Sequence, residues 1–469
     1  MATAPPASEC AGAPMRWCVW VLASAGKFFE GLVVFLGGFT LPLVVEQFQL
    51  SPLQQGGLSA SSLIGILVGA VGLGGLADRL GRRPLFIAAM ALLLLGLALV
   101  VLSPDPLWLA AGLLLIGLAL GADYPIAHLV IAECVPVARR GRMVLSAFGF
   151  QALGILLATA LAALLWPQGP EPASWRLLYL LPLPAVLLVL FGRLLLPRHS
   201  SWLLGGAELQ AARQAMIQRS GAAITGWRLL LQPPLRRATA LACLPWFLQD
   251  LATYGVGLSL PLLLAAAGAT PRPAARAALW IELMLVLGIA AAIALADRWG
   301  RIPLQISGFL GCAAGLLLAG FALGSATPSL PLLAAGLALF QFMTNLGPNA
   351  QTYLLAGELF PPPLRGLGAG GAAAAGKAGA VITALVFPLV PQQGAGLLLL
   401  SLALTSLLGA AITWCFRQET RDRDLLAELW PELPTEPVPE LPLEPSTDPL
   451  PVSSTPQPGA EAPSSAAPL

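Results

Sequence analysis

Residues 74–103 read GGLADRLGRRPLFIAAMALLLLGLALVVLS, a block of glycine and charged residues followed by an apolar run. From Pro84 to Ser103 the run holds no charged side chain. About 20 apolar residues let a helix cross the roughly 30 Å hydrocarbon core of a bilayer. The stretch therefore predicts a membrane-spanning helix that begins at a charged loop.

Similar runs recur along the whole chain of 469 residues, which is 57% apolar and only 10% charged. A soluble protein carries roughly 25% charged residues, so the composition excludes a cytosolic enzyme, a disordered regulator and a nucleic-acid binder. Twelve runs are long enough to span, at about 16–44, 54–77, 84–103, 107–131, 142–165, 176–196, 239–266, 276–296, 303–324, 330–353, 366–389 and 394–416. Because single helices satisfy their own backbone in lipid, we expect an all-α membrane protein with twelve transmembrane helices.

The spacing of the runs predicts the domain organisation. Residues between the sixth and seventh runs are rich in Arg, and the residues after the last run are rich in Pro, Glu, Ser and Thr, a composition typical of disorder. The expected parts are an N-terminal cytoplasmic segment 1–15, a six-helix bundle 16–196, a cytoplasmic linker 197–238, a second six-helix bundle 239–417 and a disordered cytoplasmic tail 418–469.

The positions of the arginines predict the orientation. With both termini in the cytoplasm, 20 Arg fall on the inner side and 3 on the outer side. Positive charge favours the cytoplasmic side of a membrane. We therefore expect a multi-pass protein of the cell membrane with both termini inside. The remaining two cations, Lys27 and Lys377, are the only lysines and lie within spans.

The two halves of the chain repeat each other. The block around Asp78 recurs around Asp297, 219 residues later, and the block E-x-x-P-x-x-x-R-G at Glu133 recurs at Glu358, 225 residues later. Glu30 and Asp250 are 220 residues apart. Two six-helix halves in the same orientation are typical of a duplicated transporter that binds its substrate between them near the midplane.

These blocks resemble the loop signatures of the major facilitator superfamily over nearly the whole chain up to about residue 425, and PRHSSWLL after the sixth span and FRQETRDRDL after the twelfth are similar to its sugar-porter-like branch. The resemblance implies two pseudo-symmetric bundles and a cytoplasmic charge network that stabilises the outward-facing state. The gating residues that it implies are Gly74, Asp78, Arg79, Gly81, Arg82, Arg83, Glu133, Arg140, Asp297, Arg298, Arg301, Glu358 and Arg365.

Five further segments resemble the phosphate:proton symporters of that superfamily: GADYPIAHLVIAE from Gly121, FGFQALG from Phe148, LPWFLQDLATYGVGL from Leu244, FMTNLGPNAQTY from Phe342 and GKAGA from Gly376. The first span departs from that family, because KFFEGLVV keeps one acid, Glu30, where the family has two. The resemblance implies substrate-binding residues Tyr124, Gln151, Trp246, Asp250, Tyr254, Asn345, Asn349 and Lys377.

A charged side chain within a span indicates a structural or functional role, because inserting it at the bilayer centre costs about 2.5–3.5 kcal/mol. Lys27 and Glu30 are three residues apart and share a helix face, so they form either a local neutral pair or part of the transport path. Lys377 has no acid within four residues, so its partner is another helix or an anionic substrate. The expected proton-coupling residues are Glu30, Asp123 and Asp250, while the roles of His128 and Glu282 stay open.

The amide side chains Gln341, Asn345 and Asn349 repeat every four residues, and they either bind substrate or bond neighbouring helices. The sequence shows no nucleotide-binding loop, metal cluster or nucleophile with a base. We expect a monomeric carrier, not an enzyme, with no cofactor, no metal and no nucleic-acid partner, driven by a proton gradient. Its expected function is proton-coupled uptake of inorganic phosphate by alternating access; the alternatives are a proton-coupled carrier of a sugar or small organic acid, and a transporter-like solute sensor.

Overall fold

The computed structural model describes residues 13–80, 82–134, 137–165, 175–196, 227–233, 235–325, 327–390 and 394–421. These residues form an all-helical structure that contains twelve helical segments long and apolar enough to cross a membrane, which confirms the expected fold class. The amphipathic part of the expected linker and most of the expected Pro-rich tail lie outside the described residues.

The first six spans form the N-terminal bundle. They are α1 (Ala13–Phe48), α2 (Pro52–Leu80), α3 (Arg82–Val101), α4 (Pro106–Cys134), α5 (Val137–Leu165) and the pair α6 (Trp175–Leu180) and α7 (Leu183–Leu194). The last six spans form the C-terminal bundle, which follows the short α9 (Trp227–Leu230). They are α10 (Leu235–Ala266), α11 (Pro271–Trp299), α12 (Arg301–Gly324), the pair α13 (Leu330–Leu346) and α14 (Pro348–Glu358), α15 (Pro362–Val386) with the 3₁₀ turn η1 (Phe387–Leu389), and α16 (Ala395–Phe416).

Two spans that the sequence predicts as continuous are broken. The sixth is interrupted at Leu181 and Pro182, and the tenth at Gly347, directly before Pro348. Proline lacks the amide hydrogen that a continuing helix needs, and its ring clashes with the preceding turn. The break in the tenth span separates α13 from α14, which carries Asn349.

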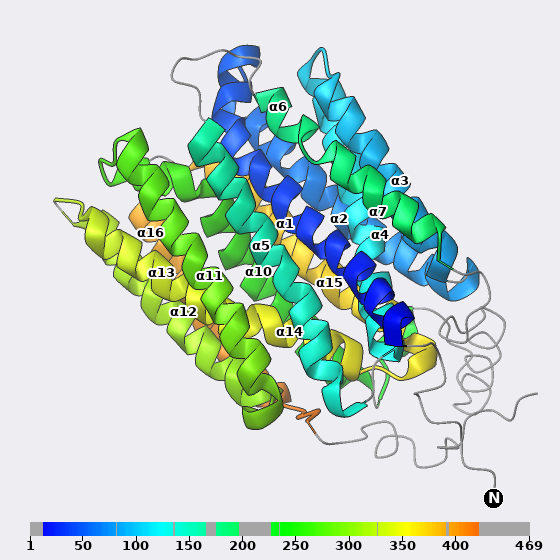
Figure 1. The fold of residues 1–469 in the computed structure, drawn as a ribbon. Helices are drawn as coiled ribbons and strands as arrows, with labels where there is room; N and C mark the ends of the chain where they lie inside the picture. The colour runs from blue at the N-terminus through cyan, green and yellow to red at the C-terminus, as the bar shows by residue number, and fades with distance from the viewer. Residues whose placement is uncertain are drawn as a thin grey trace, which may run out of the picture.

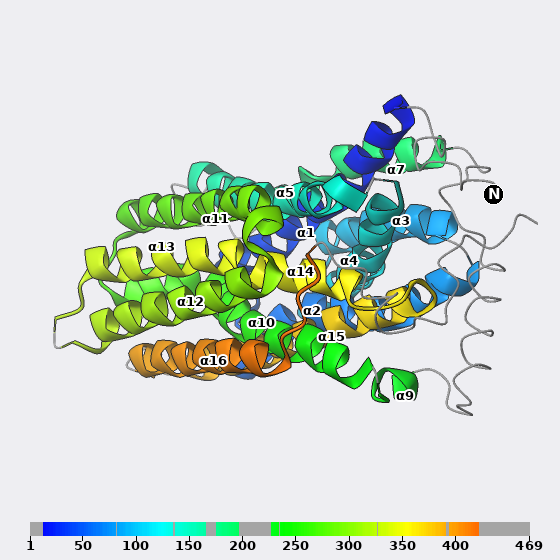
Figure 2. The same ribbon diagram turned by 90° about the horizontal axis from the view of Figure 1, so that it is seen from below.

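The two bundles meet chiefly along three helix pairs, α1 with α10, α2 with α15, and α5 with α11. Figure 1 shows α5 and α11 side by side at the boundary between the blue-to-teal and green-to-orange halves, and Figure 2 shows the same division from below. In the repeat, α2 corresponds to α11 and α5 to α15. The α2–α15 and α5–α11 contacts are therefore equivalent to each other, as a duplicated structure requires.

Glycines allow the helices within a bundle to approach closely. On α2, a Cβ atom added to Gly65 would lie 2.8 Å from the backbone nitrogen of Leu118 and 2.9 Å from Cα of Gly117 on α4. Contacts between small residues let membrane helices pack closely. Van der Waals packing then stabilises their association, because the hydrophobic effect does not drive helices together in lipid. Gly117 therefore faces Gly65 because only glycine fits on both sides of the crossing.

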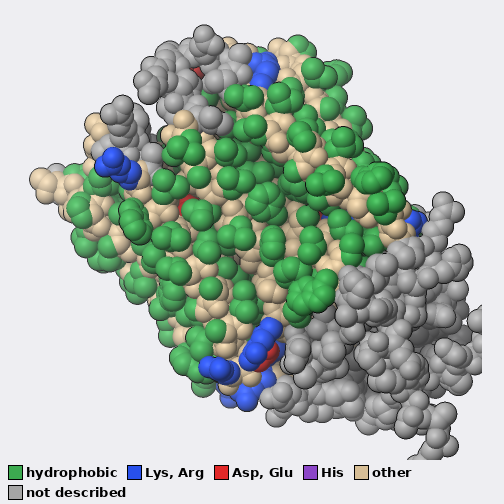
Figure 3. All heavy atoms as spheres, in the orientation of Figure 1, with side chains coloured by type: hydrophobic (Ala, Val, Ile, Leu, Met, Phe, Trp, Pro, Cys, Tyr) green, Lys and Arg blue, Asp and Glu red, His purple; other side chains and the backbone are tan. Residues whose placement is uncertain are grey.

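The outer surface is apolar over the middle of the molecule. Large side chains such as Leu107, Leu164 and Leu188 are 82%, 80% and 71% exposed. Figure 3 shows hydrophobic side chains over most of the visible face, with Lys and Arg side chains gathered toward its ends. Such a surface suits hydrocarbon and not water, so this chain is a multi-pass membrane protein.

We expect Gly65→Leu to destabilise the N-terminal bundle, because the added side chain must displace the backbone of α4. Overpacking of this kind costs about 1–3 kcal/mol or more. The melting temperature and the monodisperse yield in detergent measure the effect. The matched control is Gly72→Leu on the same helix, since a Cβ atom on Gly72 meets nothing within 4 Å. Equal melting temperatures for the two variants would contradict the proposed packing.

Candidate functional site

Two buried ion pairs meet where the bundles touch. On α1, Lys27 Nζ donates a hydrogen bond to Glu30 Oε2 at 2.9 Å. In the C-terminal bundle, Lys377 Nζ on α15 lies 3.0 Å from Asp250 Oδ2 on α10. Glu30 Oε1 lies 3.8 Å from Lys377 Nζ and so joins the two pairs across the interface. The result is a chain of alternating charges, Lys27, Glu30, Lys377 and Asp250, which we call the central charge chain.

The central charge chain is withdrawn from solvent, since each of its four side chains is at most 3% exposed. Two opposite charges 3 Å apart attract by about 5 kcal/mol at an effective dielectric constant of about 20. Removing each ion from water costs several kcal/mol, so buried pairs of this kind add little net stability. Because of this cost, ionisable side chains inside a membrane protein indicate the path of a substrate or of protons.

Aromatic rings from both bundles surround the charges. Lys27 Nζ lies 2.8 Å from the ring centroid of Tyr124 on α4 and 5.2 Å from that of Tyr353 on α14. The ring of Tyr124 packs against Tyr353 and Trp246, with centroids 5.2 and 5.6 Å apart. Lys377 Nζ donates to Tyr254 Oη at 2.6 Å. Both ammonium groups therefore sit against aromatic faces, which stabilise cations.

Local sequence features bring these side chains together. A Cβ atom on Gly376 would lie 2.5 Å from the Trp246 ring, and one on Gly379 would lie 3.2 Å from the backbone nitrogen of Leu251. Helix α15 can thus approach α10 closely, and Lys377, next to Gly376, reaches Asp250. On α4, Pro125 lies inside the helix and removes a backbone donor just after Tyr124.

The predicted amide stripe is part of a hydrogen-bonded network between helices. Asn349 Nδ2 donates to Asn345 Oδ1 at 2.9 Å, and Asn345 Nδ2 donates to the carbonyl oxygen of Gln341 at 3.0 Å. Gln249 Nε2 on α10 donates to Asn349 Oδ1 at 3.3 Å. Gln341 Nε2 donates at 3.1 Å to Glu282 on α11. Bonding between helices, one of the two interpretations of the stripe, is therefore realised.

The structure brings six predicted residues into one cluster, namely Glu30, Tyr124, Trp246, Asp250, Tyr254 and Lys377. Asn345 and Asn349 lie in the amide network. Gln151 is buried on α5 at 8% exposure, and its backbone packs where α5 crosses α1 at Gly31. His128 is buried with its ring 4.7 Å from that of Tyr353.

Sequence reasoning missed Tyr353 and Gln249. Tyr353 follows Asn349 by one helical turn, and Gln249 directly precedes Asp250. Each is a polar residue that lies next to, or one helical turn from, a predicted substrate-binding residue. That position in the sequence was the signal that could have identified them. Glu282, whose role the sequence leaves open, is 1% exposed and bonded to Gln341.

Asp123 is held by an arginine within the N-terminal bundle. Arg193 on α7 donates through both terminal nitrogens to the Asp123 carboxylate, with Nη2 at 3.2 Å from Oδ2. The same guanidinium donates to the carbonyl oxygens of Phe86 on α3 and Leu22 on α1, at 2.6 and 2.9 Å. The side chain of Arg193 is fully buried, although this residue is one of the 20 arginines that the sequence places on the inner side. Protonating Asp123 would leave that charge without its partner, so this geometry favours a structural role.

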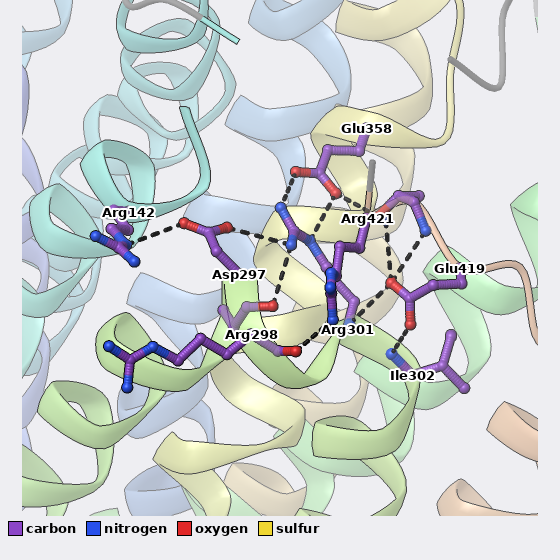
Figure 4. A network of polar contacts seen from close by, with 10 residues as sticks. Arg142, Asp297, Arg298, Arg301, Ile302, Glu358, Glu419 and Arg421 are labelled. Carbon is purple, nitrogen blue, oxygen red and sulfur yellow. Dashed lines mark hydrogen bonds and ion pairs between the residues drawn. The ribbon is translucent and has the colours of Figure 1, made fainter. Parts of the chain in front are cut away.

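A second network lies at the end of the molecule that the sequence predicts to be cytoplasmic, which we call the inner end (Figure 4). Arg301 on α12 donates to Glu358 through Nη2 at 3.0 Å and Nε at 3.2 Å, and its Nη1 lies 3.2 Å from Asp297 Oδ1. Asp297 Oδ2 on α11 lies 3.3 Å from Arg142 Nε on α5, which links the two bundles. Glu419, beyond α16, accepts from the backbone nitrogens of Arg301 and Ile302 at 2.9 and 3.0 Å.

The second copies of the predicted gating blocks therefore contribute Asp297, Arg301 and Glu358 to one network. Arg365 donates to the carbonyl oxygen of Phe360 at 3.3 Å, and Arg83 donates to those of Leu196 and Leu194 at 3.0 and 3.1 Å. Figure 4 shows the Arg298 side chain pointing away from the network. The other predicted gating residues lie outside the residues whose side chains the structure describes: Gly74, Asp78, Arg79, Gly81, Arg82, Glu133 and Arg140.

We expect Asp123→Asn to lower the melting temperature strongly, because it leaves the Arg193 charge buried without a counter-ion, at a cost of about 3–5 kcal/mol. The double variant Asp123→Leu with Arg193→Met removes both charges and should regain much of the loss. Differential scanning fluorimetry in detergent compares the three proteins. A double variant that melts no higher than the single one would contradict the pairing.

We expect Arg142→Gln to open the inner end slightly, because it removes the ion pair with Asp297. Exposed pairs contribute about 0.2–1 kcal/mol, so the inward-open population should rise by up to about fivefold. Spin labels at Met143 and Trp299, in a background without other accessible cysteines, report the separation of α5 and α11. Arg298→Gln is the control at the same end and should leave the distances unchanged; an equal shift in both variants would argue against the pair.

Comparisons with known proteins agree with this geometry. The family profile described as "Sugar (and other) transporter" matches residues 21–430. The niacin transporter NiaP of Acinetobacter baylyi is 26% identical over 427 residues, covering 87% of this chain and 94% of its own. The glucose transporter GlcP of Staphylococcus epidermidis is 26% identical over 432 residues, covering 87% and 96%.

Among solved structures, the proton:xylose symporter XylE superposes with a TM-score of 0.75 at 19% identity, covering 88% of this chain and 98% of its own. This likeness shows the major facilitator fold. These relatives are sugar, niacin and metabolite transporters, so the comparisons support the sugar-porter branch and give no support to the resemblance to phosphate:proton symporters. The sequence left the partner of Lys377 open between another helix and an anionic substrate, and the structure shows bonds to Asp250 and Tyr254 on α10.

Proposed function

The chain belongs to the Sugar (and other) transporter family, and we propose that it is a secondary active transporter that carries a small organic solute, either a sugar or a small organic acid, together with protons. The two bundles alternate in opening the central site to either side of the cell membrane, with both termini in the cytoplasm. The proton gradient supplies the energy.

The observation that carries this proposal is the contact between Glu30 and Lys377 at 3.8 Å. Each bundle brings its own ion pair to the interface, Lys27 with Glu30 on one side and Asp250 with Lys377 on the other. Parting the bundles separates Glu30 from Lys377 and exposes both groups to solute and protons. Binding and proton transfer are thereby tied to the same movement.

The relatives support an organic solute. The names of two of them refer to niacin, a ring carboxylic acid, and to glucose, a neutral sugar, and the solved structure is that of a proton:xylose symporter. Both alternatives that the sequence left open, sugar and small organic acid, therefore fit. Glu30 and Asp250 are the proposed proton-coupling residues, since they are the two acids of the central charge chain.

The inner network supports transport over a solute sensor without a transport cycle. The Arg142–Asp297 pair joins the bundles at the inner end, whereas Arg301 and Glu358 stay within the C-terminal bundle. A carrier must break and remake such a pair in each cycle, so a single partly exposed ion pair suits it. A sensor has no need of both a neutral central charge chain and a breakable gate.

In proteoliposomes with an imposed inward proton gradient, we expect accumulation of at least one of D-glucose, D-xylose and nicotinate, and none of inorganic phosphate. Lys377→Ala should reduce the initial rate at least tenfold, because it leaves Asp250 buried without its counter-ion at the centre of the site. Uptake of radiolabelled solute over the first seconds measures the rate.

Glu46→Gln is the control, since Glu46 is exposed on α1, the helix that carries Glu30. Addition of a protonophore should abolish accumulation but leave equilibration. Failure of every organic solute to accumulate, or uptake of phosphate alone, would overturn the proposed function.

A further inference from the structure

We propose that the substrate is a small carboxylic acid with a flat ring, whose carboxylate replaces Glu30 between Lys27 and Lys377 while Glu30 takes up a proton. This inference rests on the proposed function and narrows its substrate class. It makes the carboxylate of Glu30 an internal stand-in for that of the substrate.

The first support is an unpaired oxygen. Glu30 Oε2 accepts from Lys27 Nζ, but Glu30 Oε1 is buried without a hydrogen-bond partner. Its distance of 3.8 Å from Lys377 Nζ is too long for a hydrogen bond. A buried polar atom without a partner costs free energy that native structures normally avoid. The Glu30 carboxylate therefore bonds to Lys27 but does not reach Lys377. A carboxylate that is free to move could bond to both ammonium groups at this position.

The second support is the charge balance. Lys27 and Lys377 carry two positive charges, and Glu30 and Asp250 carry two negative ones, so the empty site is neutral. An added carboxylate would leave one net negative charge in a site withdrawn from water, which is costly. Protonation of Glu30 restores neutrality and releases Lys27 for the ligand, while Lys377 keeps its bonds to Asp250 and Tyr254 and offers its remaining hydrogen. A neutral sugar would leave the charge of the site unchanged, so its binding would not require this exchange.

The third support is the wall of the site. The rings of Tyr124 from the N-terminal bundle and of Trp246 and Tyr353 from the C-terminal bundle pack together beside Lys27. A flat ring can take the place of these ring contacts when the bundles part, since aromatic rings pair favourably with one another. Tyr353 Oη and Gln249 Oε1 are also buried without a partner. They can bond polar atoms on the ring of the ligand.

The groups around Glu30 are consistent with this exchange. Titratable or charged side chains face Glu30 from its own helix, from α4 and from across the interface, namely Lys27, Tyr124, Asp250, Tyr254, Tyr353 and Lys377. Asp123 lies near Lys27 but is held by Arg193. Glu30 is therefore the acid of this group that faces the lysines of both bundles.

Calorimetry of nicotinate binding to the purified protein tests the inference. Repeating the titration near neutral pH in buffers of different ionisation enthalpy counts the protons taken up. We expect wild type to take up about one proton per nicotinate and to bind nicotinamide, which lacks the carboxylate, at least tenfold more weakly. Glu30→Gln should still bind nicotinate but take up no proton, whereas Lys377→Gln should bind roughly tenfold to a hundredfold more weakly because a charged hydrogen bond is lost.

Glu46→Gln is the matched control and should behave as wild type. If Glu30→Gln does not fold, the number of protons that wild type takes up per nicotinate still tests the inference. Nicotinate binding without proton uptake, unchanged uptake in Glu30→Gln, or equal binding of nicotinamide would overturn the inference. Binding and accumulation of D-glucose or D-xylose without nicotinate would also overturn it while leaving the proposed function intact. Absence of accumulation for every organic solute tested would instead remove the proposed function.

Discussion

The attraction between buried opposite charges at the contact of the two bundles is the interaction on which the rest depends. A charge inside the membrane must be compensated, and compensation requires close contact. The pairs within each bundle are short, at 2.9 and 3.0 Å, whereas the contact between bundles is long, at 3.8 Å. Each bundle can therefore move as a neutral body. The weak link lies where movement has to occur.

The same division of labour holds at the inner end. Arg301 is tied firmly within the C-terminal bundle by two hydrogen bonds to Glu358, while the link to the other bundle is one ion pair with the partly exposed Arg142. Glu419 adds its carboxylate to the first backbone nitrogens of α12, where a helix attracts negative charge. Strong bonds thus stay inside a bundle, and the contacts between bundles are the ones that can open cheaply.

Much of the fold could be predicted from the sequence, because each span is decided locally by about 20 apolar residues. Even the breaks are readable afterwards, at Pro182 and Pro348. The site was harder, because its contacts are not local. No acid lies within one helical turn of Lys377 in the sequence, and its partner Asp250 is 127 residues away. Arg193 lies in the last turn of α7, yet its side chain reaches Asp123 on α4, a contact that no local pattern in the sequence indicates.

The unequal spacing of the two central pairs has a consequence for biogenesis. Lys27 and Glu30 are neighbours on α1, so their charges neutralise each other as soon as that helix enters the lipid. Asp250 and Lys377 belong to helices made at different times. The translocon must insert α10 with an uncompensated acid and α15 with an uncompensated base, and only their association cancels both. Of the two pairs in the central charge chain, the one in the C-terminal bundle can therefore form only after α15 has been synthesised, just as the Asp123–Arg193 pair of the N-terminal bundle can form only after α7 has been synthesised.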